Sequence, residues 1–305
     1  MKHYLLIIIL FLFSLQAEAQ NTKSSDAKSL KQKKMIVALK EYPKKASEEM
    51  KLLIDSSNAS LKFAMQNYWT FSEVVEFMPI SEAKDFIKEN KESHSYVAIE
   101  LGISKSTKKA ENDNIRGNAY RYVSYSERIG IYAPSLISST FLPHYEGPLT
   151  KAAAVFAVIQ MQKVLELLYQ EEFTSMMGSR SYVKNNGQKI KSKTLLIPKE
   201  YISDDLTPEE IREAYPFDLE ICDLQKIEKA ILDRDAKYAV MYHVPIPIGG
   251  KFLYRLYISS AEDGDVYGTA DGGKVYLDLG IFGDTSKKSY LIRDKELKQI
   301  AKITE

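Results

Sequence analysis

Few side chains in this sequence have types that suit acid–base or metal chemistry. Besides His3, the histidines are His94, His144 and His243, and no two of them stand at the spacing of a short zinc-binding motif. His144 lies in an expected loop and is best placed for chemistry, whereas His243 lies on an expected strand. We therefore keep His144 and His243 as weak candidate catalytic residues, for a site that must form by convergence of distant segments.

Alternating carboxylates at Glu262, Asp263 and Asp265 suggest calcium, because hard cations prefer oxygen ligands. An EF-hand loop needs a further ligand where Tyr267 stands, and a more distant glutamate that is missing here. The pair Asp263-Gly264 is instead typical of a tight turn between two strands. We therefore predict a hairpin turn and no metal site.

The common nucleophile and cofactor motifs are absent from the sequence. There is no Gly-x-Ser-x-Gly elbow, no phosphate-binding loop motif and no Gly-x-Gly-x-x-Gly turn, so we expect no cofactor. Asn186-Gly187, flanked by Tyr182-Val183 and Lys189-Ile190, favours a tight hairpin. Four lysines near this turn favour a solvated basic patch rather than an anion site: Lys184, Lys189, Lys191 and Lys193.

The densest aromatic group is Tyr68-Trp69-Thr70-Phe71, which holds the only tryptophan. It stands where a long helix is expected to meet the next strand. One interpretation is a hydrophobic plug that closes the helix end. The other is a binding patch formed by Tyr68, Trp69 and Phe71, because aromatic side chains dominate recognition surfaces. Both interpretations remain open from the sequence.

The first nineteen residues have the pattern of a cleavable secretory signal. Lys2 supplies the positive start, residues 5–15 are apolar apart from Ser14, and Ala17-Glu18-Ala19 fits the small-x-small cleavage rule. An uncleaved anchor is the alternative, but the apolar stretch is shorter than the roughly 20 residues that span a bilayer. We therefore expect export to the periplasm or the medium, with no membrane span in the mature chain.

Composition limits the classes of partner. A net charge of +1 argues against nucleic-acid binding, which needs clustered positive charge. The single cysteine, Cys222, excludes an internal disulfide and a lipid anchor at a mature N-terminal cysteine. We expect its thiol to be buried and structural.

Apolar periodicity predicts strands and helices in an order that occurs twice along the chain. Ile80, Ala83 and Ile87 stand 144 positions before Leu224, Ile227 and Ile231, on equivalent short helices. Tyr96 and Tyr238 begin equivalent strands after these helices. The pattern predicts an α/β fold, with α+β as the alternative: two tandem βαβαβ-type repeats packed through a long central helix, with a C-terminal β-meander.

The predicted divisions follow from this order. They are a signal peptide (1–19), a flexible basic leader (20–34), a first repeat (35–145), a linking segment (146–179) with a buried helix over 151–177, and a second repeat (180–305). Pro43 to Gln66 is expected to hold a long helix in the first repeat. Thr207-Pro208-Glu209-Glu210 begins the short counterpart.

Export followed by βαβαβ repeats resembles uncharacterised exported proteins of Gram-negative bacteria. The element order also resembles the amino-terminal domain of the envelope protein TolB, although no propeller repeats follow here. The leading hypothesis is a non-enzymatic protein that binds a cell-envelope protein or a small ligand in an inter-repeat cleft, its oligomeric state left open. The alternative is an exported hydrolase built from converging His and carboxylate groups.

Overall fold

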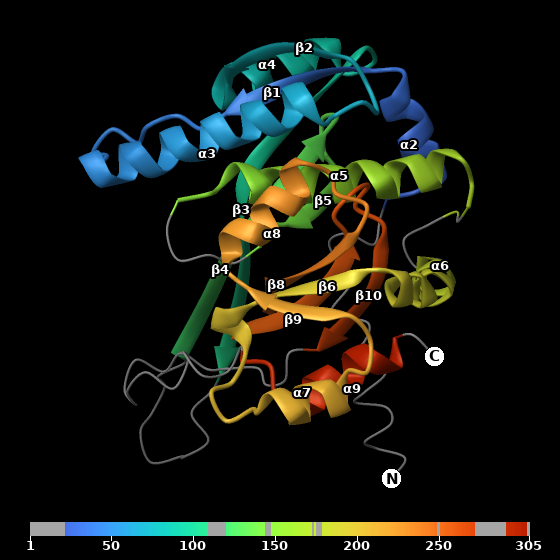
Figure 1. Cartoon of the computed structure of the whole chain (residues 1–305). Coiled ribbons are helices and arrows are strands. Elements are labelled where there is room, and N and C mark those ends of the chain that lie inside the picture. The colour runs from blue at the N-terminus through green and yellow to red at the C-terminus, as the bar shows by residue number, and fades with distance from the viewer. Residues whose placement is uncertain are drawn as a thin grey trace.

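The computed structural model describes residues 22–108, 120–143, 148–172, 174, 179–248, 251–271 and 291–303. The fold is α/β, as predicted, with two mixed five-stranded sheets (Figure 1). The predicted signal peptide and His144 lie outside the described residues.

The first repeat begins with a short helix and ends with a long one. Its sheet has the order β2-β1-β3-β4-β5, in which β1 is parallel to β2 and β3 while β4 is antiparallel to β3 and β5. In chain order its elements are α2 (Ser24–Lys31), β1 (Lys34–Leu39), α3 (Glu48–Asn67), β2 (Val74–Pro79), α4 (Ile80–Asn90), β3 (His94–Lys108), β4 (Tyr120–Tyr132), β5 (Leu136–Phe141) and α5 (Lys151–Tyr169).

The second repeat has the same plan. Its sheet order is β10-β9-β8-β6-β7, with β6 parallel to β7 and β8 and with antiparallel pairing from β8 to β10. Its elements are α6 (Ser179–Asn186), η2 (Gly187–Ser192), β6 (Thr194–Pro198), η3 (Lys199–Tyr201), α7 (Pro208–Ala214), β7 (Leu219–Cys222), α8 (Leu224–Leu232), β8 (Tyr238–Ile248), β9 (Lys251–Ser260), β10 (Val266–Asp271) and α9 (Asp294–Lys302).

The two sheets therefore agree strand by strand in order and direction, as a tandem duplication requires. The predicted difference in the first crossover is also present, since α3 has 20 residues and α7 has 7. The short helix begins as its sequence predicts: the Thr207 hydroxyl accepts from the Glu210 amide, and the Glu210 carboxylate accepts from the Thr207 amide.

Each sheet is covered by helices on both faces. Along β1, Met35 and Val37 enter the core beneath α3 and α5, whereas Ile36 and Ala38 face α4, because side chains alternate across a strand. In the second sheet the α7–α9 side has its own core. Figure 1 shows α4 with β1 and β2 at the top, then α3 with α5, then the second sheet, and α7 with α9 at the bottom. The long strands β3 and β4 run downward and contact the second sheet.

The central helix α5 is shared between the repeats, as predicted. It packs on α2, α3 and β5 of the first repeat and on α8 of the second. One core cluster contains its Ala153–Ile159 stretch together with Leu196, Val240 and Tyr242. By length and composition α5 is, among the described residues, the one helix that could cross a membrane, but 72% of that stretch is buried within the protein. Its apolar surface is explained by two sheets that enclose it.

Three local predictions need correction. The leader is not flexible throughout, because α2 forms within it and buries Ala27 and Leu30 completely. Two apolar residues at i and i+3 suffice, since α5 provides the surface against which they pack. The central helix ends at Tyr169 rather than 177, and Glu171 adopts a positive φ of 61° just beyond it.

The third correction concerns Asn186-Gly187, which is not a hairpin turn. Asn186 ends α6 and Gly187 begins the 3-10 helix η2. Gly187 packs so closely that a Cβ there would lie 2.1 Å from the Ile303 carbonyl oxygen. The glycine is therefore required by a close approach to the chain after α9, not by a two-residue turn.

Candidate functional site

The aromatic group predicted as a possible binding patch closes the core. Trp69 and Phe71 are 6% and 1% exposed, with ring centroids 5.9 Å apart. Tyr68 is half-buried, and its hydroxyl donates to the Leu232 carbonyl at the end of α8, 2.6 Å away. Tyr68 thus joins the two repeats of this chain, and burial removes Trp69 and Phe71 from the surface.

The described histidines do not converge. His243 is buried on β8 with its ring 4.2 Å from that of Tyr201. His94 begins β3 in the other repeat and packs edge-on against Phe86. Nowhere in the described part of the chain do three or more His, Cys, Asp or Glu side chains form a group able to hold a metal ion.

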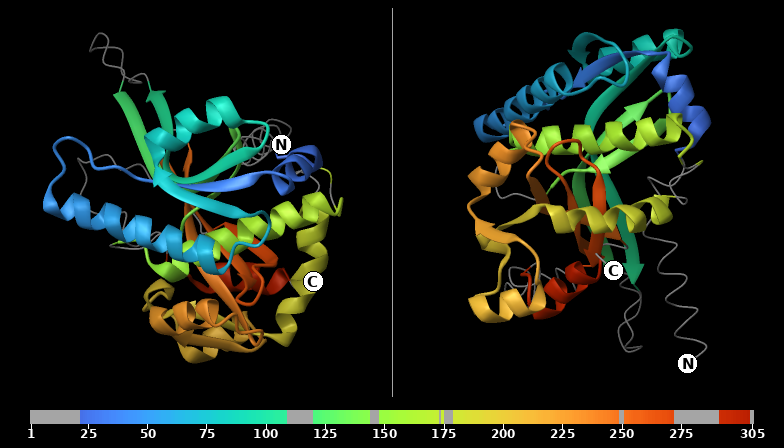
Figure 2. Two further views of the ribbon diagram at one scale, coloured as in Figure 1. Left: turned by 90° about the horizontal axis from the view of Figure 1, so that it is seen from above. Right: turned by 45° about the vertical axis from the view of Figure 1, so that its right-hand side comes forward.

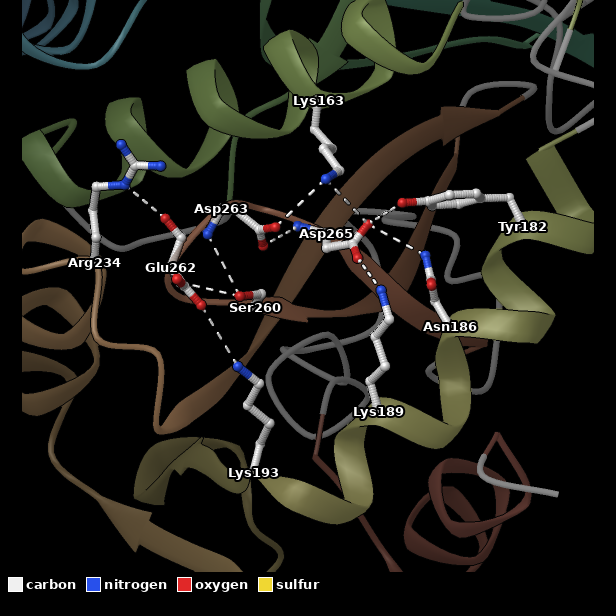
Figure 3. A network of polar contacts seen from close by, with 10 residues as sticks. All are labelled: Lys163, Tyr182, Asn186, Lys189, Lys193, Arg234, Ser260, Glu262, Asp263 and Asp265. Carbon is white, nitrogen blue, oxygen red and sulfur yellow. Dashed lines mark hydrogen bonds and ion pairs between the residues drawn. The ribbon is translucent and has the colours of Figure 1, made fainter. Parts of the chain in front are cut away.

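The acidic segment suspected of binding calcium is a hairpin turn, as predicted, and it docks on α5 (Figure 3). Gly264 has a φ of +71°, and a Cβ there would meet the α5 backbone at the Gln160 amide nitrogen, 3.1 Å away. Asp265 is 3% exposed and accepts hydrogen bonds from the Tyr182 hydroxyl at 2.6 Å and from Lys189 at 3.0 Å.

Lysines occupy the positions around this turn that a cation would need. Lys163 of α5 lies 3.4 Å from Asp263 and 3.9 Å from Asp265. Burial alone would raise the pKa of Asp263, but the Asp265 amide, the Ser260 hydroxyl and Lys163 together lower it. Lys189 is exposed, as predicted, with 55% of its side chain accessible, and it also pairs with Asp265. Because Lys163 belongs to α5, its ion pairs fasten this turn of the second repeat to the first.

The expected inter-repeat cleft is filled, because α5 and a continuous core occupy that space. A shallow hollow of about 470 Å³ instead lies on the far side of the first sheet, beside α4. We call it the outer groove. Its lining residues are Ser81, Lys84, Asp85, Ile87, Lys88, Tyr96 and Pro134.

Beneath the outer groove lie two buried tyrosines, of which only Tyr96 is a lining residue, and Glu100 lies beside them. Tyr96 of β3 and Tyr132 of β4 stack with ring centroids 4.8 Å apart and planes 12° from parallel. They stand opposite each other in the β3–β4 pairing. The Tyr132 hydroxyl donates to Glu100, and a Cβ at Gly130 would collide with the Tyr132 ring. Glycine at this position lets the ring lie flat on the sheet.

Both tyrosines beneath the groove stay protonated at neutral pH. Burial, and then the nearby charge of Glu100, raises the pKa of Tyr96 to about 12. Burial and the hydrogen bond to Glu100 also raise the pKa of Tyr132 above its ordinary value. Tyr96 and Tyr132 are 4% and 7% exposed, so these neutral rings give the groove little aromatic surface and supply no proton acceptor.

One wall of the groove is the charged side of α4. Lys84 and Lys88 are 50% and 72% exposed, and Lys84 lies 3.8 Å from Glu100. Lys88 pairs with Asp85 one turn earlier at 2.7 Å, an exposed i, i+3 pair that contributes little to stability. These ammonium groups remain available to a negatively charged group brought into the groove.

The duplication shows what fills the equivalent place in the second repeat. On α8, Glu228 and Leu232 correspond to Lys84 and Lys88, and on β8 Tyr242 corresponds to Glu100. This second groove contains α5: α8 packs against it, and the Phe156 and Tyr242 ring centroids are 4.5 Å apart. The outer groove is thus the open counterpart of a groove that a helix occupies.

Sequence reasoning missed the outer groove, although it had aligned both helices and both strands that form it. Comparison with known proteins returns no match: no family model, no curated protein and no solved structure matches this chain. The resemblance to the TolB amino-terminal domain therefore stays a prediction based on element order.

Proposed function

We propose that this is an exported, non-enzymatic cell-envelope protein that binds a polypeptide partner in the outer groove. The observation that carries the proposal is the equivalence of this groove to the one that α5 fills. A surface that buries a helix in one repeat and is open in the other suits a partner supplied from outside. Exposed lysines on the wall, above tyrosines that are buried and neutral, suit binding better than proton transfer.

The geometry gives less support to the hydrolase alternative. A hydrolytic site needs a base within hydrogen-bond reach of a nucleophile or a water, in a place that substrate can enter. His243 is 2% exposed and stands beside Tyr201 rather than in the groove. His144 lies outside the described residues and stays an untested candidate.

Site-specific photo-crosslinking tests the proposal in living cells. A photo-reactive amino acid replaces Lys88 in the groove and, as a matched control, Lys298, which is a 56% exposed helical lysine on α9. We expect adducts from position 88 and few from position 298. Equal labelling from both positions would contradict a specific groove partner.

Export is tested separately by mass spectrometry of the N-terminus after cell fractionation. We expect a chain that begins at Gln20 in the periplasm or the medium. A chain that begins at Met1 in the cytosolic fraction would contradict the cell-envelope location. The proposed binding in the outer groove would then depend on the crosslinking result alone.

A further inference from the structure

We infer that the partner in the outer groove is a second copy of this chain, which inserts the N-terminal half of its α3. The inference rests on the proposed function, since it names the polypeptide that the groove binds. Three observations lead to it: the shape of the groove, the exposed stripe of α3, and the charges of both.

The first observation is that the equivalent groove accepts a helix. Beside α8, the occupant α5 presents an aromatic ring to the strand floor at Tyr242. Beside α4, the corresponding space has Tyr96, Ile87 and Pro134 along its lining. Ile87 and Tyr96 are only 1% and 4% exposed, so an apolar stripe on a short helix would cover Pro134 and the edges of these two side chains.

The second observation is that α3 projects beyond the sheet that it covers. Figure 1 and the left view of Figure 2 show its N-terminal end extending away from both sheets. Asn58 exchanges hydrogen bonds with the Lys40 backbone, and the Ser60 hydroxyl donates to Leu149, so α3 is fixed from its middle onward. The projecting tip, residues 48–55, comes before these contacts.

The apolar stripe of α3 continues onto this tip. Leu61, on the inward stripe, is 1% exposed. Met50 and Leu53 continue the same stripe but are 44% and 41% exposed, because no strand lies beneath them. Exposed apolar side chains that continue a core stripe mark a surface for another polypeptide.

The third observation is complementary charge. The tip begins with Glu48 and Glu49, and the Glu48 side chain is 86% exposed. The groove wall carries Lys84 and Lys88, which correspond to Glu228 and Leu232 in the groove that α5 fills. Seating Met50 and Leu53 beside Pro134 brings Glu48 and Glu49 of the tip near these lysines, whose partners within the chain are Glu100 and Asp85.

The C-terminal helix α9 does not have the properties of the α3 tip. The outward side of α9 carries Lys295, Lys298 and Lys302, which would repel Lys84 and Lys88. Tip and groove are different surfaces of one chain, so the contact is head-to-tail. Such contacts form either a closed ring or an open filament.

Charge reversal in purified protein spanning residues 20–305 tests the inference by sedimentation. One variant carries Lys84→Glu and Lys88→Glu, and another carries Glu48→Lys and Glu49→Lys. We expect the unaltered chain to self-associate with rising concentration, and each variant to do so at least tenfold more weakly. An equimolar mixture of the two variants should regain association, because each tip then meets a groove of opposite charge.

The control variant carries Lys298→Glu and Lys302→Glu on α9 and should associate as the unaltered chain does. Circular dichroism of every variant verifies the fold. A chain that stays monomeric at all concentrations, or a mixture that fails to regain association, overturns the inference. Photo-crosslinks from position 88 to a different protein would then still support the proposed function. The absence of any crosslink from position 88 would contradict both the inference and the proposed function.

Discussion

At the scale of single residues, the thiol of Cys222 illustrates how burial controls reactivity. Cys222 is buried at the end of β7, as its apolar neighbours predicted. Burial, and then the charge of Glu220, raises the pKa of the thiol to about 11. Since the thiolate is the reactive form, the native protein at pH 8 should react very slowly with a disulfide reagent.

The measurement is the rate of thiol labelling with and without urea. Unfolding should return the thiol to ordinary reactivity and release one equivalent of product per chain. Rapid labelling of the native protein at pH 8 would show instead that the Cys222 thiol is exposed and reactive.

Asp263 gives a pH dependence whose sign follows from its lowered pKa. The folded carboxyl holds a proton less readily than the unfolded one, so its contribution to stability is complete above its ordinary value of 3.8. That contribution is lost as the pH falls through the lower folded-state pKa. Asp263→Asn should therefore reduce stability at pH 6 and flatten the fall in stability below about pH 4.

Urea denaturation between pH 2.5 and 6 measures this effect, in steps of about half a unit, fine enough to resolve one titration. Asp85→Asn serves as control, since the Asp85 side chain is 77% exposed and forms its ion pair with Lys88 of its own helix. A pH profile of Asp263→Asn parallel to that of the unaltered chain would show that the turn does not hold Asp263 in its ionised form.

At the scale of elements, α3 has both buried turns and projecting turns, so the effect of a substitution on each can be compared within one helix. Leu61→Ala should lower the free energy of unfolding by about 2–5 kcal/mol, because it leaves a cavity beside α5. Leu53→Ala on the projecting tip should change it by less than about 0.5 kcal/mol. Chemical denaturation of both variants checks this, and equal losses would place the tip within the folded core.

The same helix shows which elements periodicity can predict. The apolar spacing placed α3 correctly but began it at Pro43, whereas the helix starts at Glu48 after its Ser47 cap. Periodicity places Met50 and Leu53 on the same face as Leu61, but a stripe on a helix does not show where the underlying sheet ends. Exposure of an amphipathic turn depends on the length of neighbouring strands.

The elements that were missed depend on tertiary contacts. Leu30 was the only large apolar residue in the expected leader, yet a single buried leucine and Ala27 fix α2 against α5. Asn186-Gly187 has a strong local preference for a turn, but packing against Ile303 decides the outcome. The candidate site was hidden for the same reason: Tyr96, Tyr132 and α4 come together only through the order of the strands.

At the scale of the whole molecule, the repeats are stacked so that α5 is enclosed by both. The sequence offset of 144 predicted the duplication, and a first half of α5 that is apolar apart from Lys151 and Gln160 predicted enclosure. The direction of stacking required the structure, because the α3 side of one sheet faces the α8 side of the other. This arrangement leaves the outer groove on the far side of the first sheet, away from α5.

A core shared in this way predicts that the two repeats unfold together. The chain holds one probe in each repeat: Trp69 in the first, read by fluorescence, and Cys222 in the second, read by thiol exposure. Both should report the same urea midpoint, since a cooperative unit gives coincident transitions. Phe156→Ala should lower both midpoints by the same amount, with a loss of about 3–5 kcal/mol, because its ring packs on Tyr242 across the boundary.

Leu297→Ala in the separate core under α9 provides the matched comparison. In a single cooperative unit, that distant cavity should also shift Trp69 fluorescence, although no contact joins Leu297 to the core around Trp69. If Leu297→Ala moves the Cys222 transition alone, the repeats are independent units and α5 merely fills the space between them. Coincident shifts would instead make α5 the element through which the stability of one repeat depends on the other.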